Sequence, residues 1–304
     1  MFKLFACLLG AGALVAGAAP AGADPSQDER ASVAFHWRDP NITESSGLAL
    51  VSGFFVTAND NGDEGRVFTV DSSGSTVGVT KWNQRPRDVE AVAPAGPGSV
   101  WVGDIGDNHA QRSTISVGKV PVGRGTRTVT PSAYTLAYPD GPHNAEALLV
   151  HPVTHRLYIA TKEFVGASLY AAPPTLRAGI VNRLSRVGSV ASVVTDGAFD
   201  ADGCHLVLRT YGKAHVYALT GLRKIGSATL PTQQQGEGLA LMRDNTIYLS
   251  SEGRYSDVLR YRLPSTLDNA LRATAPDPDL MSWLAPGTSA AAAAAAAWAQ
   301  AAQD

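Results

Sequence analysis

Five polar residues recur along the chain at intervals of 44, 56, 50 and 41 residues. Each is followed directly by Gly or Ala and then by apolar residues. They are Ser46, Glu90, Glu146, Asp196 and Glu237. Carboxylate and hydroxyl oxygens are ligands that calcium accepts in loose geometry, whereas zinc and copper favour the His and Cys that this set lacks. If the five residues meet, they predict a calcium site. In the alternative interpretation they accept backbone N–H groups and hold the fold together without a metal.

A second polar set follows the first, where a β-rich run ends in each repeat. Its members are Asn59, Asp60, Asp104, Lys162, Glu163, Arg209 and Glu252. Carboxylates beside the basic Lys162 and Arg209 could hold a cation together with an anionic group such as phosphate or carboxylate. We therefore expect a ligand-binding funnel, with turn residues and ion pairs of the scaffold as the alternative. No Gly-x-Ser-x-Gly elbow and no Walker loop occurs, and no catalytic nucleophile or base can be named.

Two loops are more polar than a turn requires. Residues 59–64, Asn-Asp-Asn-Gly-Asp-Glu, place oxygen ligands at alternate positions like a calcium loop, but they lack the final Glu of an EF-hand. Residues 103–108, Gly-Asp-Ile-Gly-Asp-Asn, repeat Gly-Asp, which favours a sharp turn with positive φ.

The repeat that spaces these residues also predicts the fold, because its period is close to the ~40–50 residues of a four-stranded propeller blade. Each copy continues into a second and a third β-rich run. Four copies add a fourth strand, near residues 77–82, 133–138, 181–187 and 224–230. The fifth lacks one, but residues 32–37 form an unused strand that can complete the last blade.

We therefore predict an all-β chain that forms a single β-propeller of five four-stranded blades, closed by its N-terminal strand. No helical periodicity competes with this interpretation over the body of the chain. The first strand of each propeller blade lines the central channel, so the five recurring residues should point at the axis.

The composition and the two ends of the chain suggest a compartment and partners. Residues 1–23 combine Lys3, an apolar run and Ala21-Gly22-Ala23, which predicts a secretory signal and an extracellular or cell-envelope location. We assign residues 24–31 to a linker, 32–268 to the propeller and 269–304 to a Pro-rich, then Ala-rich tail. A net charge of -2 without a basic stretch argues against nucleic acid, and the apolar runs are too short for a membrane span. The expected partner of this monomer is a small anionic molecule or an extracellular surface ligand.

Several strings resemble a group of secreted bacterial propeller proteins, most of which have no assigned activity. The most specific is Gly103-Asp104-Ile105-Gly106-Asp107-Asn108, supported by Asn59-Asp60-Asn61-Gly62-Asp63 and Asp88-Val89-Glu90-Ala91-Val92-Ala93. More distantly, the Ser-Gly-Leu and Glu-Gly-Leu strands resemble esterase-like domains related to phytases. The axial order Ser, Glu, Glu, polar, Glu is similar to calcium-dependent apyrases. That resemblance implies one calcium in the channel and hydrolysis of nucleoside diphosphates, although Asp196 stands where apyrases usually have Ser.

These patterns lead to one expectation and one alternative. We expect a secreted propeller with an axial calcium site, whose funnel binds an anionic ligand and could hydrolyse a phosphate or other ester. The alternative is a non-enzymatic extracellular binding propeller whose axial ring is purely structural.

Overall fold

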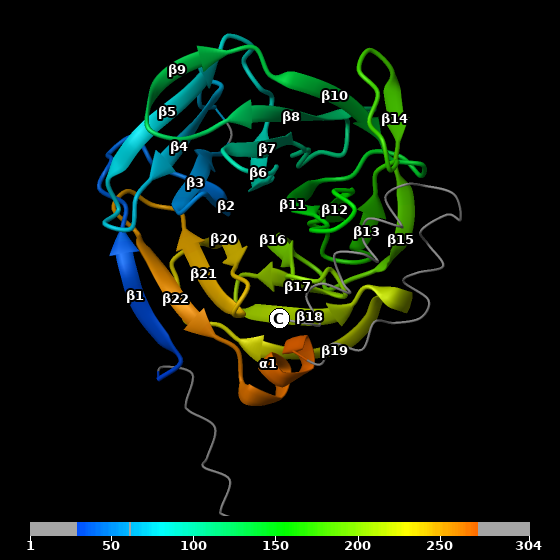
Figure 1. The fold of residues 1–304 in the computed structure, drawn as a ribbon. Helices are drawn as coiled ribbons and strands as arrows, with labels where there is room; N and C mark the ends of the chain where they lie inside the picture. Colours follow the sequence, from blue (N-terminus) through cyan, green and yellow to red (C-terminus); the bar gives the residue numbers. More distant parts are fainter. Residues whose placement is uncertain (1–28, 61, 273–304) are drawn as a thin grey trace, which may run out of the picture.

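The computed structural model describes residues 29–60 and 62–272. They form five β-sheets, each with four antiparallel strands, arranged as the blades of a ring (Figure 1). The fold is therefore a five-bladed β-propeller, as the sequence predicts. The predicted signal sequence, most of the linker and almost all of the tail lie outside the described residues.

In blades 1 to 4 the four strands run outward from the axis in sequence order, whereas in blade 5 the N-terminal strand is the outermost. Blade 1 contains β2 (Ser45–Val51), β3 (Phe54–Asn59), β4 (Arg66–Val70) and β5 (Thr76–Trp82). Blade 2 contains β6 (Val89–Pro94), β7 (Ser99–Asp104), β8 (Ile115–Pro121) and β10 (Ser132–Ala137). Blade 3 contains β11 (Ala145–Val150), β12 (Leu157–Thr161), β13 (Ser168–Ala171) and β15 (Ser185–Ser189). Blade 4 contains β16 (Val194–Phe199), β17 (His205–Thr210), β18 (Lys213–Ala218) and β19 (Arg223–Thr229). Blade 5 contains β20 (Gly236–Leu241), β21 (Thr246–Ser251), β22 (Asp257–Arg262) and β1 (Ala31–His36). A single turn of 3-10 helix, η1 (Thr220–Leu222), precedes β19.

The predicted closure of the ring is confirmed. Strand β1 pairs antiparallel with β22, from Ala31 opposite Tyr261 to His36 opposite Asp257. Figure 1 shows the blue and orange strands side by side at the rim. Buried aromatic rings secure the junction, because Phe35 lies 4.8 Å from the ring of Phe55 in blade 1. Both ends of the propeller are thereby held in one sheet.

Two blades have a fifth, outer strand that the sequence did not reveal. Strand β9 (Gly125–Val129) adds parallel to β5, and β14 (Val181–Arg183) adds parallel to β10. The single strand predicted at residues 181–187 is therefore wrong: its first half belongs to blade 2 and its second half to blade 3. Leu184 separates the halves, because its buried side chain and its N–H bond to the Ala137 carbonyl fix the chain between the blades.

A short helix, α1 (Ser265–Arg272), follows the last strand, and the predicted propeller boundary at residue 268 falls inside it. Leu267 and Leu271 on one face of the helix are buried in a hydrophobic cluster shared by blades 4 and 5. The sequence did not reveal α1, because a single apolar pair gives little periodicity. Over the described ranges, no helix is long and apolar enough to cross a membrane.

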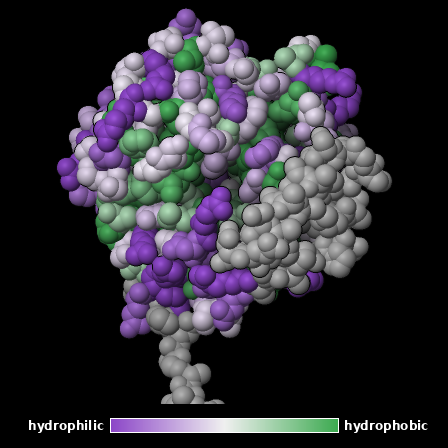
Figure 2. Space-filling view, in the orientation of Figure 1, coloured by the Kyte–Doolittle hydropathy of each residue, from purple (hydrophilic) through white to green (hydrophobic). Residues whose placement is uncertain are grey.

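The inner strands pack against one another around the axis, and small residues allow it. Strand β2 contacts β6 and β20, while β16 contacts β11 and β20. Gly47 of β2 has φ 72, and a side-chain carbon there would lie 2.6 Å from the backbone nitrogen of Val92 in blade 2. The small residue in the repeated pattern thus permits close approach of neighbouring blades. In the space-filling view, hydrophobic patches alternate with hydrophilic ones over the face of the ring (Figure 2).

Candidate metal centre at the propeller axis

Irregular pairing of the inner strands shapes the axial site. Each inner strand has a bulge or register shift at or beside its recurring polar residue, as between Val89 and Ala91 in β6 or Ala145 and Ala147 in β11. A bulge leaves one residue out of the ladder and redirects its side chain. Glu90 and Glu146 occupy these positions and are buried.

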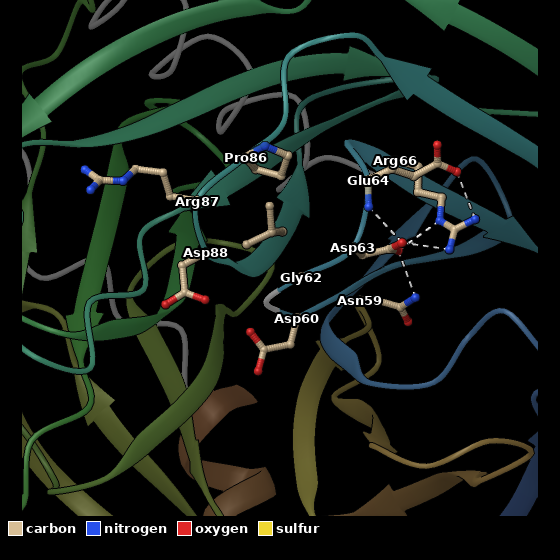
Figure 3. Close-up of a pocket in the computed structure, with 10 residues that line it drawn as sticks. Asn59, Asp60, Gly62, Asp63, Glu64, Arg66, Pro86, Arg87 and Asp88 are labelled. Atoms are coloured by element: carbon tan, nitrogen blue, oxygen red, sulfur yellow. Dashed lines mark hydrogen bonds and ion pairs between the residues drawn. The ribbon is translucent and has the colours of Figure 1, made fainter.

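The structure brings Asp60, Asp88 and Glu90 together, with one oxygen of each within 4.8 Å of the others. Asp60 follows β3 of blade 1, whereas Asp88 directly precedes β6 of blade 2 and Glu90 is its second residue. Figure 3 shows the Asp60 and Asp88 carboxylates pointing into the same space between the two blades. Three oxygen donors from two blades could supply part of the oxygen ligand shell that a hard divalent cation takes.

Asp88 is nine-tenths buried, and its Oδ1 has no hydrogen-bond partner among the described residues. Burial, followed by the charge of Asp60, raises its pKa to about 6. Burial, together with Glu146 and Asp60, raises the pKa of Glu90 to about 10. Ser46 Oγ donates to Glu90 Oε2 at 3.2 Å and to its carbonyl at 2.8 Å. Crowded, buried carboxylates without sufficient counter-charge either retain protons or bind a cation.

Lys162 supplies the counter-charge on the other side of the axis. Its Nζ lies 2.5 Å from Glu146 Oε2 and 3.8 Å from Glu237 Oε1. Burial disfavours its charged form, but Glu146 and Glu237 outweigh burial and raise the pKa of Lys162. Burial and Glu237 nevertheless raise the pKa of Glu146 to about 8, and burial also raises that of Glu237. Lys162 is thus an internal cation for these two acids.

Asp196 and Arg209 hold blades together. Asp196 Oδ2 accepts the N–H groups of Leu48 in blade 1 and Leu239 in blade 5, at 3.2 and 2.6 Å. Its Oδ1 accepts the next N–H of its own strand, and burial raises its pKa to about 8. For Asp196, the geometry matches the structural alternative drawn from the sequence.

Arg209 lies opposite Asp196 in the strand pairing and is fully buried, not exposed in a funnel. Its guanidinium donates to the carbonyls of Gly238 and Ser250 and to Gln233 Oε1. Strand position predicts that this side chain points toward the axis, but not that blade 5 covers it completely.

The remaining residues of the expected funnel mainly organise loops. Asn59 Oδ1 accepts the N–H groups of residues 43 and 44, and Asp104 accepts those of residues 87 and 88. Glu163 Oε1 lies 2.6 Å from His143 Nδ1. Glu252 Oε1 accepts from Gln235, and burial followed by Glu237 raises the pKa of Glu252 to about 7.

The polar loop at residues 59–64 divides its carboxylates between two tasks. Asp63 turns away from the axis and binds Arg66 at 2.8 Å, while also accepting from Asn59 Nδ2. Figure 3 shows Asp63 and Asp60 pointing to opposite sides of the loop. The likeness to a continuous calcium loop does not extend to this geometry, since Asp60 reaches the axial cluster and Asp63 does not.

The loop at residues 103–108 has a different role from the one expected. Neither Gly103 nor Gly106 has positive φ, so the predicted conformational reason for these glycines is wrong. A side-chain carbon on Gly106 would lie 2.3 Å from Asp88 Oδ2 and 2.7 Å from Glu90 Oε1. Glycine is therefore needed because two carboxylates occupy the space beside the loop.

Sequence reasoning missed two contributors to this site. Asp88 lies only two residues before Glu90, but it precedes β6 and Glu90 lies in the bulge of that strand, so strand periodicity does not predict that they meet. Arg112 is buried, lies 2.8 Å from Asp104 Oδ1 and donates to the Gly106 carbonyl at 2.6 Å. No local pattern marks Arg112, because its partners come from a loop that only the fold shapes.

A second acidic group lies away from the axis, in the hairpin between β16 and β17. It consists of Asp200, Asp202 and His205. Asp200 already binds His205 Nδ1 at 2.7 Å and accepts two backbone N–H groups, and Asp202 accepts a third. These hydrogen bonds account for the group as part of a tight turn.

Comparison with known proteins establishes the fold and does not extend to activity. No protein-family model matches the chain, and no curated protein matches its sequence. Among solved structures, Myxococcus xanthus glutaminyl cyclase has a TM-score of 0.50 at 12% identity, over 77% of this chain and 96% of that one. A gluconolactonase from Xanthomonas campestris has a TM-score of 0.45 at 14% identity, over 73% of this chain and 86% of that one. At these identities the likeness is one of fold.

Proposed function

We propose that this protein is a secreted propeller that binds one divalent cation through Asp60, Asp88 and Glu90. We propose calcium as the cation, because all three side chains offer oxygen ligands. The buried, unpartnered Oδ1 of Asp88 inside this three-carboxylate cluster is the observation that carries the proposal. Of the five-residue metal ring predicted from the sequence, this set keeps only Glu90; Asp60 was expected in the funnel, and Asp88 was not predicted. Ser46 hydrogen bonds Glu90, Lys162 serves Glu146 and Glu237, and Asp196 accepts backbone amides.

We further propose that the bound cation recruits an anionic ligand and supports hydrolysis of a phosphate or other ester. A bound calcium would polarise the ester oxygen, which is ordinary metal-assisted chemistry. Lys162 would add a second positive charge, since it opposes the raised pKa of Glu90 and so acts electrostatically across the axis. Among the described axial residues the acids outnumber Lys162, and Arg209 is enclosed. An anion should therefore bind only when the cation is present.

A calcium titration of the chain from residue 24 onward, after chelator treatment, tests the cation site. We expect one bound calcium in the wild-type protein and at least about a tenfold loss of affinity in Asp88→Asn, because one charged ligand is removed. Asp63→Asn is the matched control, since Asp63 lines the same pocket but binds Arg66. Equal affinities in Asp88→Asn and Asp63→Asn, or no calcium uptake, would contradict the proposed site.

A panel of phosphate and carboxylate esters, assayed with and without calcium, then separates an enzyme from a binding protein. Calcium-dependent turnover that Asp88→Asn abolishes supports the hydrolase. Calcium binding without turnover of any ester supports the alternative, a non-enzymatic extracellular binding propeller.

A further inference from the structure

The axial ion pairs lie beside an aromatic ring. Tyr211 occupies the turn between β17 and β18, and Lys162 Nζ lies 4.9 Å from the centre of its ring. The same ammonium contacts Glu146 at 2.5 Å. Tyr211 is 42% exposed, although Lys162 and Glu146 are largely buried. One side of the ring therefore belongs to the axial charge network, while much of its remaining surface is open.

Corresponding loops place Tyr211 at the mouth that holds the candidate metal centre. Asp60, Lys162 and Tyr211 each follow the second strand of a blade, and these turns open on one face of a propeller. Phe164 and Val165, in the same loop as Lys162, are 87% and 88% exposed. Among the described residues, the mouth thus combines carboxylates and the Lys162 ammonium at its centre with apolar surface in the Lys162 loop.

This arrangement favours a ligand with two chemically different parts. An anionic head would be attracted to the bound cation and to Lys162, whose charge reaches Glu90 of the cation site. A flat apolar group attached to that head would find the open ring of Tyr211. Aromatic rings pack on one another in offset or edge-to-face geometry and gain more than burial of area alone.

We propose that the ligand is an aryl ester, such as a phenyl phosphate, whose ring packs on Tyr211 while its anionic group lies between the cation and Lys162. This inference rests on the proposed cation site and specifies its substrate class. Tyr211 is then a specificity-determining residue, and the aromatic ring matters more than its hydroxyl.

Calorimetry with two non-hydrolysable probes, phenylphosphonate and methylphosphonate, tests the inference on calcium-saturated protein. We expect the wild-type protein to prefer the phenyl probe by about 3- to 10-fold, the range of one aromatic contact. Tyr211→Phe should keep this preference and Tyr211→Ala should lose it. Tyr255→Ala, which removes a 55% exposed tyrosine from the corresponding loop of blade 5, should keep it.

Each outcome decides the inference. Equal affinity for both probes in the wild-type protein, a preference that survives in Tyr211→Ala, or binding of neither probe overturns it. The calcium titration is measured separately on each variant. Calcium binding without a phenyl preference therefore rejects the aryl ligand alone, whereas loss of calcium binding in the wild-type protein rejects the cation site itself.

Discussion

At the scale of single residues, the buried carboxylates at the axis are compensated to three different degrees. Lys162 neutralises Glu146 and Glu237, backbone amides solvate Asp196, and Asp88 Oδ1 has no hydrogen-bond partner among the described residues. Burial makes such compensation necessary, because an uncompensated charge in a protein interior is costly. This difference explains why acids of the same chemistry in one ring need not all bind a metal.

Replacement of the internal cation should have a pH-dependent cost. We expect Lys162→Met to lower the free energy of unfolding by about 3 kcal/mol at pH 9, because it leaves the buried carboxylate of Glu146 without its ion-pair partner. The loss should shrink at pH 5, since a pKa of about 8 for Glu146 means that it is then protonated. Urea unfolding at both pH values measures the effect.

The control for this experiment is Lys213→Met, which changes an exposed lysine of β18. It should leave stability nearly unchanged at either pH. An equal loss at pH 5 and pH 9 in Lys162→Met would indicate that packing, and not charge, accounts for the role of Lys162.

Sequence spacing predicted the axial residues but not how their charges are compensated. The repeat placed Glu90, Glu146 and Glu237 on inner strands, where all three are buried. For Arg209, strand periodicity predicts the side of the strand on which the side chain lies but not that it is fully buried. The N–H groups that Asp196 Oδ2 accepts come from blades 1 and 5, from residues distant in the sequence.

At the scale of elements, the loop at residues 103–108 acts as a wall for the candidate metal centre. Asp107 accepts the N–H groups of residues 111 and 112, and its own N–H bonds Asn144 Oδ1 of blade 3 at 2.7 Å. The loop is thus held from both sides, and Gly106 cannot easily move away from Asp88.

Filling the space at Gly106 should disturb the carboxylates selectively. We expect Gly106→Ala to weaken calcium binding at least about tenfold and to lower the free energy of unfolding by about 1–3 kcal/mol, the usual cost of overpacking. Gly212→Ala is the control, because a side-chain carbon there meets nothing within 4 Å. Calcium titration and urea unfolding check both effects, and wild-type affinity in Gly106→Ala would contradict the proposed wall.

The strands illustrate what periodicity can and cannot predict. The two innermost strands of each blade follow a strong apolar pattern because most of their residues are buried between blades. Strands β9 and β14 are short and largely exposed at the rim, so their sequences lack that pattern. Their parallel pairing depends on chain segments that cross to a neighbouring blade.

At the scale of the whole molecule, the axial acids should make stability depend on pH. The pKa values of Asp88, Glu252 and Glu146 are raised to about 6, 7 and 8, chiefly by burial. The folded state therefore holds protons that the unfolded state has released above about pH 4, so stability falls as pH rises toward 8.

Thermal melting in chelator should show this trend, with the melting temperature decreasing from pH 5 to pH 8. Calcium should raise the melting temperature more at pH 8 than at pH 5, because protons compete with the cation for the same carboxylates. A flat profile in chelator, or an equal calcium effect at both pH values, would count against a strained acidic axis.

The closure of blade 5 by β1 also constrains the order in which the molecule can be made. A ribosome releases β1 first and β22 among the last strands, so the first strand has no partner until almost the whole propeller has been synthesised. Its buried Phe35 stays exposed for that time. Blades 1 to 4 can pair internally as they emerge, but the ring becomes a closed unit only at the end. We infer that folding of this chain is completed after synthesis, and that it is most prone to aggregation just before its two ends meet.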